Sequence, residues 1–307
     1  HAISKNSILT STPTIQSICK KAIVKKILAN RHCEQSEAIQ KKLPGDSSSF
    51  QSSEGQISEG RVFEDQNLEP VEIFVYLQNN MCSILLNTTG ESLHKRGYKQ
   101  ATGEAPINEA LAAGLLLLSG RKFSEPLYDL FCGSGTIAIE AAMIAKNIAP
   151  GILRGFAFQY FSRYDQTLFD RAIQEAKGKM MLDKQHTIIA SDIDPQMIKI
   201  AQENAKNAGV EKYIHFETKD IKDYIGGPEL IGSIVSNPPY GLRLQMFELI
   251  QIYRTITQLF DTNPKLHGGI ISSYEDFAPS SISGTRKKTT FYNGGEKCWF
   301  YKKTLLK

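Results

Sequence analysis

The sequence has no apolar run long enough to cross a membrane. A transmembrane helix needs about 18 or more consecutive apolar residues, and the longest run here is Leu111–Leu118. That run has the length of a buried helix in a globular core. With 41% hydrophobic and 22% charged residues over 307 positions, the composition is that of a globular protein of one or two domains, and no membrane association is expected.

Cysteine is scarce, and its spacing disfavours the usual zinc and redox motifs. The five cysteines include no Cys-x-x-Cys pair, whereas a structural zinc site needs about four ligands. We therefore predict no metal, and reduced thiols in a bacterial cytoplasmic protein. The chain starts at His1 without a charged-then-apolar leader, so we interpret it as a fragment or trimmed product and not as a secreted precursor.

Composition also predicts the domain organisation. Residues 1–90 suggest a small α+β region that a Ser- and Gln-rich insert at 29–60 interrupts, because such a stretch without periodicity is typical of loop or disorder. Residues 91–104 are polar and basic, as in a linker, and residues 105–307 form the second predicted domain. The net charge of +4 permits nucleic-acid binding without arguing for it.

Two elements are predicted in the first region. Residues 11–28 have helical periodicity, with lysines opposite an apolar face. Those lysines are either a solvated face or contacts to RNA phosphates. Residues 71–77 and 81–86 are strand-like and flank Gln78-Asn79-Asn80, so we predict a hairpin.

From residue 106 onward, strand-like and helix-like segments take turns. This alternation predicts βαβ units and therefore an α/β, Rossmann-like fold with a mostly parallel sheet. The last two strands flank Asn293-Gly294-Gly295 and are expected to form an antiparallel hairpin. The predicted strands are 127–131, 187–191, 213–217, 233–236, 269–273, 289–292 and 297–302, and the predicted helices are 107–119, 136–147, 195–208 and 244–260.

The stretch Leu127–Ala142 combines a strand, a small-residue turn and a helix. The turn is Cys132-Gly133-Ser134-Gly135, in which glycine lets the backbone turn sharply and lets a ligand approach closely. The unpaired N–H groups of the following helix could cradle a phosphate or a carboxylate. A Gly-x-Gly after a strand occurs in many α/β proteins, so this turn alone does not identify the ligand.

Carboxylates follow the next two strands. Asp192 and Asp194 end the second strand, and Asp220 follows the third. An acidic residue at the first of these places typically accepts from ribose hydroxyls. We expect Asp194 to cap the following helix and Asp192 to bind a ribose. Asp220 is either an adenine ligand, which we favour, or a turn carboxylate.

The most specific motif is Ser236-Asn237-Pro238-Pro239-Tyr240-Gly241 at the end of the fourth strand. Two prolines fix the backbone and remove two N–H donors. The Asn237 oxygen and the Pro238 carbonyl could therefore hold both hydrogens of one planar amino group. Tyr240 offers an aromatic face to a base that has left its stack. The alternative is a strained surface turn, which we disfavour because parallel sheets bind ligands at this edge.

These motifs give the chain its resemblance to a known family. DLFCGSGT, SDID and SNPPYG resemble class I S-adenosylmethionine methyltransferases that modify amino groups. With GESLHKRGYK, APINEALAAGLLLLSG, NIAPGILRGFAF and FYNGGEKCWFY, the chain more narrowly resembles the bacterial THUMP-domain rRNA guanine-N2 methyltransferases over roughly residues 84–302. Residues 1–90 would then be a partial THUMP-like RNA-binding region.

The resemblance implies a set of site residues. Phe131, Gly133 and Gly135 would lie against the methionine moiety of S-adenosylmethionine, Asp192 at its ribose and Asp220 at its adenine. Asn237, Pro238, Pro239 and Tyr240 would form the catalytic group. The complete set predicted to bind the cofactor is Pro106, Asp129, Phe131, Cys132, Gly133, Gly135, Thr136, Asp192, Ile193, Asp220 and Asn237.

Basic residues near aromatic ones suggest contacts to RNA. Stacking on unpaired bases, together with cations on the backbone, is the usual mode of single-strand binding. The alternatives to RNA contact are an ordinary basic linker, a solvated loop and aromatic side chains that cover the sheet. The predicted RNA contacts are Lys95, Arg96, Tyr98, Arg154, Arg286 and Lys287.

The predicted function is methyl transfer to guanine N2 of 23S rRNA, free or in a pre-ribosomal particle, by a monomer. The proline motif does not separate guanine N2 from adenine N6, so an adenine-N6 DNA methyltransferase stays open. A non-catalytic RNA-binding or assembly protein also stays open, because the first region is split. Leu242 stands where the family often has an acid.

Overall fold

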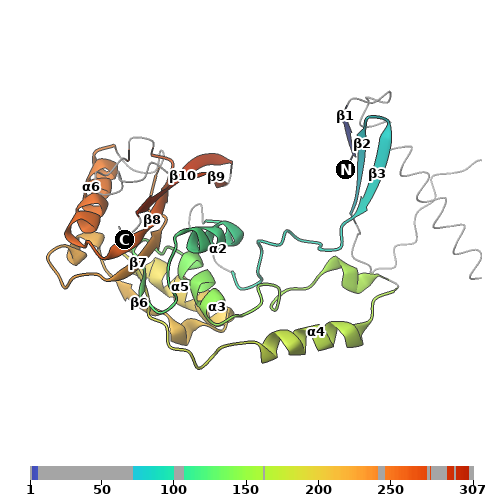
Figure 1. The fold of residues 1–307 in the computed structure, drawn as a ribbon, viewed down its shortest axis with the longest axis horizontal. Coiled ribbons are helices and arrows are strands. Elements are labelled where there is room, and N and C mark those ends of the chain that lie inside the picture. The colour runs from blue at the N-terminus through green and yellow to red at the C-terminus, as the bar shows by residue number, and fades with distance from the viewer. Residues whose placement is uncertain are drawn as a thin grey trace, which may run out of the picture. The chain divides into compact units, whose positions relative to one another are not determined.

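The computed structural model describes residues 2–5, 72–99, 107–161, 163–240, 246–274, 277, 289–293 and 295–303. The chain divides into two units, one of His1–Glu91 with Phe156–Tyr164 and one of Ser92–Gly155 with Asp165–Lys307 (Figure 1). The predicted helix at 11–28 and the predicted insert at 29–60 lie outside the described residues. The same holds for Pro106, Arg286 and Lys287.

The first unit contains a three-stranded sheet. Strand β1 (Ala2–Lys5) pairs in parallel with β2 (Ile73–Gln78), which pairs antiparallel with β3 (Met81–Leu86). Asn79 and Asn80 both have positive φ, 49° and 61°, as a tight two-residue hairpin turn requires. The predicted hairpin is therefore confirmed, whereas β1 was not predicted.

The second unit is built on a seven-stranded sheet of order β6-β5-β4-β7-β8-β10-β9. The five strands from β6 to β8 are parallel, and β10 runs antiparallel to both β8 and β9. This confirms the predicted Rossmann-like sheet and its closing hairpin. The strands are β4 (Leu127–Asp129), β5 (Ile188–Asp192), β6 (His215–Thr218), β7 (Gly232–Ser236), β8 (Leu266–Ser272), β9 (Thr289–Asn293) and β10 (Glu296–Lys303).

Alternating side chains of this sheet enter two separate cores. Leu127 and Val235 belong to one hydrophobic cluster, and their neighbours Tyr128 and Ile234 belong to the other. Successive side chains of a strand point to opposite faces, so the sheet is covered on both sides. Helices α2 (Glu109–Leu118), α3 (Thr136–Ala145) and α5 (Pro195–Asn207) lie on one face, and α6 (Met246–Thr262) lies on the other (Figure 1).

Helix α4 (Gln166–Gly178) was not predicted. Asp165 caps it by accepting from the N–H groups of Thr167 and Leu168, and none of its side chains is buried. Three short 3-10 helices complete the described elements: η1 (Ala157–Tyr160), η2 (Glu211–Tyr213) and η3 (Ile221–Tyr224). Within the described ranges, no helix combines the length and the apolar character needed to span a bilayer.

Arg121, just after α2, is a buried cation without a hydrogen bond or an ion pair to any described residue. Only 9% of its surface is exposed, and none of its three guanidinium nitrogens has a hydrogen bond. Its Cζ lies 4.9 Å from the centre of the Phe123 ring, which offers a weak cation–π contact. Burial lowers the pKa of Arg121 to about 10, so the group stays charged at neutral pH at a cost in stability.

We expect Arg121→Met to raise the free energy of unfolding by about 2 kcal/mol, because a buried charge without a partner costs more than an apolar side chain of similar length. Urea unfolding of the purified protein measures this. Lys122→Met is the matched control: Lys122 is 73% exposed, so its removal should change stability by less than about 0.5 kcal/mol. A less stable Arg121→Met variant would contradict the expectation.

Candidate active site

The site lies where the strand order of the large sheet reverses. Strand β4 is bordered by β5 on one side and by β7 on the other, and ligands of such folds bind beyond the carboxyl ends of the strands at this point. A cavity of about 630 Å³ opens there. Its walls come from the loops after β4, β5, β6 and β7 and from one side of α6.

The turn Cys132-Gly133-Ser134-Gly135, here called the glycine turn, forms one wall of this cavity. Gly133 has φ 51°, and a Cβ on it would meet nothing within 4 Å, so its backbone is open to a ligand. Gly135 is the N-cap of α3 with φ 84°, and a Cβ there would lie 3.0 Å from the Ala201 side chain. Gly133 thus faces the cavity, whereas Gly135 is needed for the turn and for close packing of α3 on α5.

Asp192, the last residue of β5, connects this strand to the glycine turn. Its carboxylate accepts from the Gly133 N–H at 2.9 Å and from the Asp194 N–H at 3.0 Å, and it lines the cavity. Two bonds leave further lone pairs of the carboxylate available to a ligand hydroxyl. Asp194 accepts from the Gln196 N–H at 2.8 Å and caps α5, as predicted.

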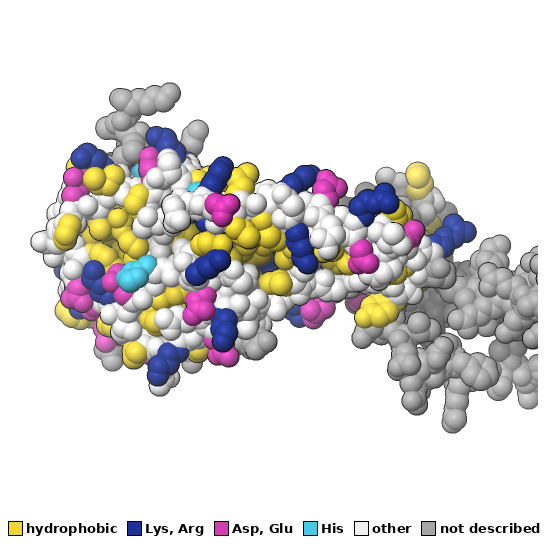
Figure 2. Space-filling model, turned by 90° about the horizontal axis from the view of Figure 1, so that it is seen from below, with side chains coloured by type: hydrophobic (Ala, Val, Ile, Leu, Met, Phe, Trp, Pro, Cys, Tyr) yellow, Lys and Arg dark blue, Asp and Glu magenta, His cyan; other side chains and the backbone are white. Residues whose placement is uncertain are grey.

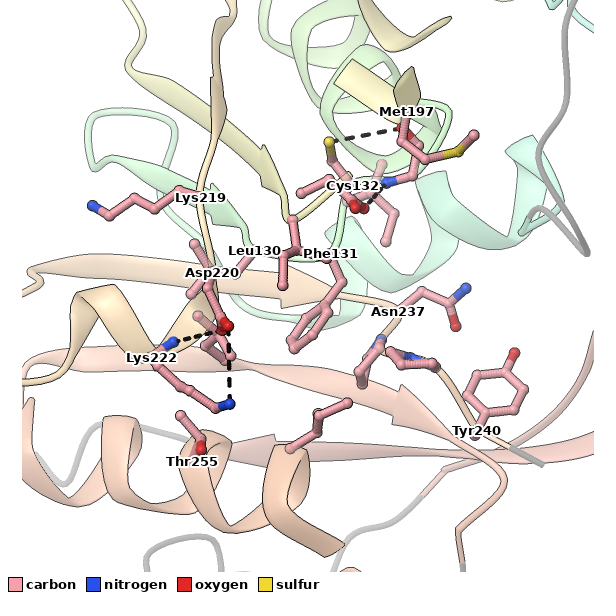
Figure 3. A pocket seen from close by; sticks show the side chains of 18 of the residues that line it. Leu130, Phe131, Cys132, Met197, Lys219, Asp220, Lys222, Asn237, Tyr240 and Thr255 are labelled. Atoms are coloured by element: carbon pink, nitrogen blue, oxygen red, sulfur yellow. Dashed lines mark hydrogen bonds and ion pairs between the residues drawn. The ribbon is translucent and has the colours of Figure 1, made fainter. Parts of the chain in front are cut away.

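Asp220 stands at the opposite end of the cavity from Asn237, with the Phe131 side chain between them in the view of Figure 3. It caps η3 by accepting from the Lys222 N–H at 3.0 Å, and Lys222 Nζ lies 4.0 Å from its other oxygen. The predicted turn role is therefore present, and the carboxylate also lines the cavity. Ile193 is 67% exposed at the rim.

The proline turn, which follows β7 and runs from Asn237 to Tyr240, forms the wall beside the glycine turn. Asn237, Pro238, Pro239 and Tyr240 all line the cavity, and the first and last are labelled in Figure 3. The Asn237 Oδ1 atom is buried and has no hydrogen-bond partner among the residues that the structure describes. A buried acceptor without a donor is costly, so this atom is available for an amino group entering the cavity.

Asp129 does not line the cavity. It lies at the end of β4 with none of its surface exposed. Burial raises the pKa of its carboxyl to about 7, against a smaller lowering effect of the Ser236 hydroxyl. Asp129, which was predicted to bind the cofactor, is therefore buried outside the cavity lining, where a direct contact with a ligand in the cavity is not available.

The predicted RNA contact of Tyr98 is wrong, whereas a contact of Arg96 to RNA stays a prediction. Tyr98 is fully buried, and its hydroxyl donates to Glu140 Oε1 at 3.2 Å, so it has no free face on which a base could stack. Arg96 Nε lies 3.4 Å from the same carboxylate, and its side chain is 12% exposed. Burial raises the pKa of Glu140, and Arg96 opposes this shift.

The Arg154 side chain is hydrogen-bonded to the backbone of the segment 92–97, which contains Lys95. The Arg154 guanidinium donates to the carbonyls of Ser92 at 2.7 Å and Lys95 at 2.9 Å. The Lys95 side chain is exposed and the Arg154 side chain is half-buried, so contacts to RNA stay predictions. On the face shown in Figure 2, Lys and Arg side chains are interspersed with Asp and Glu and form no separate basic patch.

One wall of the cavity was missed from the sequence. Side chains from the first half of α6 line it, among them Glu248, Gln251 and Thr255. Their spacing of three, four and seven residues places them on one face of the helix. Other lining residues that were not predicted are Ile107, Leu130, Ser134, Ile137, Met197, Lys219, Ile221, Lys222, Phe247 and Ile252. No group of three or more His, Cys, Asp or Glu residues in the described part of the chain is arranged to hold a metal.

Comparison with known proteins finds a family whose model matches this chain. The model of the RMKL-like methyltransferase domain matches residues 96–294. The chain belongs to this methyltransferase family. It is 36% identical over 299 residues to "Putative RNA methyltransferase YpsC" of Bacillus subtilis (strain 168), covering 97% of this chain and 71% of that protein.

Two further comparisons agree. "Ribosomal RNA large subunit methyltransferase K/L" of Shewanella baltica (strain OS195) is 38% identical over 244 residues, 76% of this chain but only 34% of that protein. The chain thus spans about a third of the K/L protein. The crystal structure of "SMU.472, a putative methyltransferase complexed with SAH" superposes with a TM-score of 0.78 at 32% identity, covering 100% of this chain and 74% of that one.

S-adenosylmethionine is the cofactor of this methyltransferase domain, and the cavity fits it. The open backbone at Gly133 suits close approach by the ligand, and the spare lone pairs of Asp192 suit ribose hydroxyls. Asp220 and the partly buried Phe131 line the same space. Cys132 is a free thiol in this wall, and burial raises its pKa well above the usual range, so it stays protonated and unreactive.

Proposed function

We propose that the protein methylates an exocyclic amine of a purine in RNA, most specifically guanine N2 in 23S rRNA, free or in a pre-ribosomal particle. The observation that carries this proposal is the buried Asn237 Oδ1 atom, which has no partner in the described part of the chain and lines one cavity with Tyr240 and the glycine turn. The names of the relatives YpsC and K/L favour RNA over DNA. The proposed setting is the bacterial cytoplasm, with the protein acting as a monomer.

In the proposed reaction the side chains position and polarise the amine. When bound, S-adenosylmethionine supplies an electrophilic methyl group on a sulfonium sulfur. The Asn237 oxygen and the Pro238 carbonyl accept the two amine hydrogens, which favours a tetrahedral nitrogen with its lone pair toward the methyl carbon. The transfer would form a C–N bond as the C–S bond of the cofactor breaks, and the nitrogen would release one proton to solvent. Burial raises the pKa of Tyr240, so its phenol stays neutral and is not the base.

Glu248 supports guanine over adenine. Its carboxylate lines the cavity from α6 and has no hydrogen bond or ion pair within the described residues. The Watson–Crick edge of guanine offers an N1–H donor beside N2, whereas adenine offers an N1 acceptor beside N6. A carboxylate acceptor therefore attracts the first edge and repels the second.

We expect Glu248→Gln to lower kcat/KM for a guanine-containing RNA about tenfold and to leave the Kd for S-adenosylmethionine unchanged. An amide is a weaker acceptor than a carboxylate, since hydrogen bonds to charged groups are roughly twice as strong. Steady-state transfer of labelled methyl measures the effect. Glu203→Gln, an exposed site on α5 away from the cavity, is the control. Unchanged kcat/KM in Glu248→Gln would contradict this role.

The experiment that tests the proposed function compares substrates for one preparation of the protein. Labelled methyl from S-adenosylmethionine is offered with unmodified 23S rRNA, with large-subunit precursor particles and with duplex DNA, and the product nucleoside is identified by mass. N2-methylguanine in RNA supports the proposal. N6-methyladenine in DNA would replace it, and cofactor binding without any transfer would favour a non-catalytic RNA-binding protein.

A further inference from the structure

The hydroxyl of Tyr240 is held by the hairpin that closes the sheet. Asn293, the last residue of β9, donates from Nδ2 to the Tyr240 Oη atom at 3.1 Å across 53 residues of sequence. The buried Cys298 side chain on β10 is a close neighbour of the same hydroxyl. Tyr240 is 4% exposed but lines the cavity, so a fixed portion of its ring faces the ligand space.

The proline turn is also held from the other side. Tyr253 on α6 donates from its hydroxyl to the Pro239 carbonyl at 3.4 Å, and the same hydroxyl is bonded to Ser272 Oγ at the end of β8. Two independent supports therefore reach the turn, one to its backbone through Tyr253 and one to its aromatic ring through Asn293. Only the second of these two supports contacts the Tyr240 side chain itself.

We propose that Asn293 is a positioning residue for the target base, acting through the Tyr240 hydroxyl. This rests on the proposed function, because it assigns the Tyr240 ring as the surface on which the base lies. A ring that rotates when its hydroxyl is released no longer stacks the base at the distance from Asn237 that the amine needs. Stacking on an aromatic side chain and near-attack geometry both depend on such fixed orientation.

This role predicts effects on RNA and not on the cofactor. Asn293→Ala should raise KM for RNA and lower kcat, with a combined loss in kcat/KM of about tenfold, as expected for loss of one buried hydrogen bond. The Kd for S-adenosylmethionine should stay within twofold. Thr290→Ala on the same strand, where the side chain is exposed, is the control for a general disturbance of the hairpin.

A double-mutant cycle tests whether Asn293 acts through Tyr240. Tyr240→Phe removes the same hydrogen bond from the other side, so it should reproduce the kinetic effect, and Asn293→Ala added to it should change kcat/KM by less than twofold. This variant also serves if Asn293→Ala does not fold. Additive losses in an active enzyme would overturn this inference alone. No transfer by the wild-type protein to any RNA would overturn the proposed function together with it.

Discussion

Asn237→Ala is expected to lower the rate of methyl transfer at least 100-fold while S-adenosylmethionine still binds. The buried Asn237 Oδ1 atom accepts no hydrogen bond from the described residues, so it is free to accept one from an amine that enters the cavity. Removal of one preorganised hydrogen-bonding group at a reacting atom typically costs 10² to 10³ in rate. Single-turnover transfer from labelled cofactor measures the rate, and equilibrium titration measures cofactor binding.

The control for this variant is the same chemical change at a site outside the cavity. Asn207 on α5 is also partly buried, and its Nδ2 donates to the Tyr98 carbonyl at 3.3 Å. Asn207→Ala should lose a little stability and keep transfer near the wild-type rate. Wild-type transfer by Asn237→Ala would remove the basis of the proposed function, whereas loss in both variants would indicate a general structural defect.

The sheet was predictable because its strands are short apolar segments between clear turn and helix signals. Leu127–Asp129, Gly232–Ser236 and the closing hairpin all lie within a few residues of the predicted bounds. Helix α4 was missed although its apolar side chains Phe169, Ile173 and Ala176 recur at helical spacing. These side chains are only partly buried, and the helix begins at the Asp165 cap.

The parts of the site that carry a sequence motif were predictable. The glycine turn and the proline turn follow β4 and β7, and the topology brings their residues into one cavity. The α6 wall has no motif, although its polar side chains at 248, 251 and 255 share one face. Burial was the harder property: Tyr98 and Arg96 come from a polar stretch, and their partner Glu140 is 42 and 44 residues away. A single acid within the apolar helix α3 was the available signal.

Asp129→Asn is expected to stabilise the protein at pH 8 by up to about 4 kcal/mol and to have no effect near pH 4. Burial raises the pKa of the Asp129 carboxyl to about 7 in the folded protein, whereas an unfolded Asp titrates near 3.9. Between these values the folded state holds the extra proton, so wild-type stability falls as pH rises and levels off above about 7. Three pKa units correspond to about 4 kcal/mol. An asparagine does not ionise and avoids this loss.

Urea unfolding at pH 4.5 and at pH 8 measures the difference between wild type and Asp129→Asn. The control is Asp183→Asn, an exposed carboxylate, which should leave the pH dependence unchanged. Equal stability of wild type and Asp129→Asn at pH 8 would show that the buried carboxyl ionises without penalty. Retained cofactor binding by the variant would assign Asp129 to support of the glycine turn, because its side chain lies outside the cavity that Gly133 and Asp192 share.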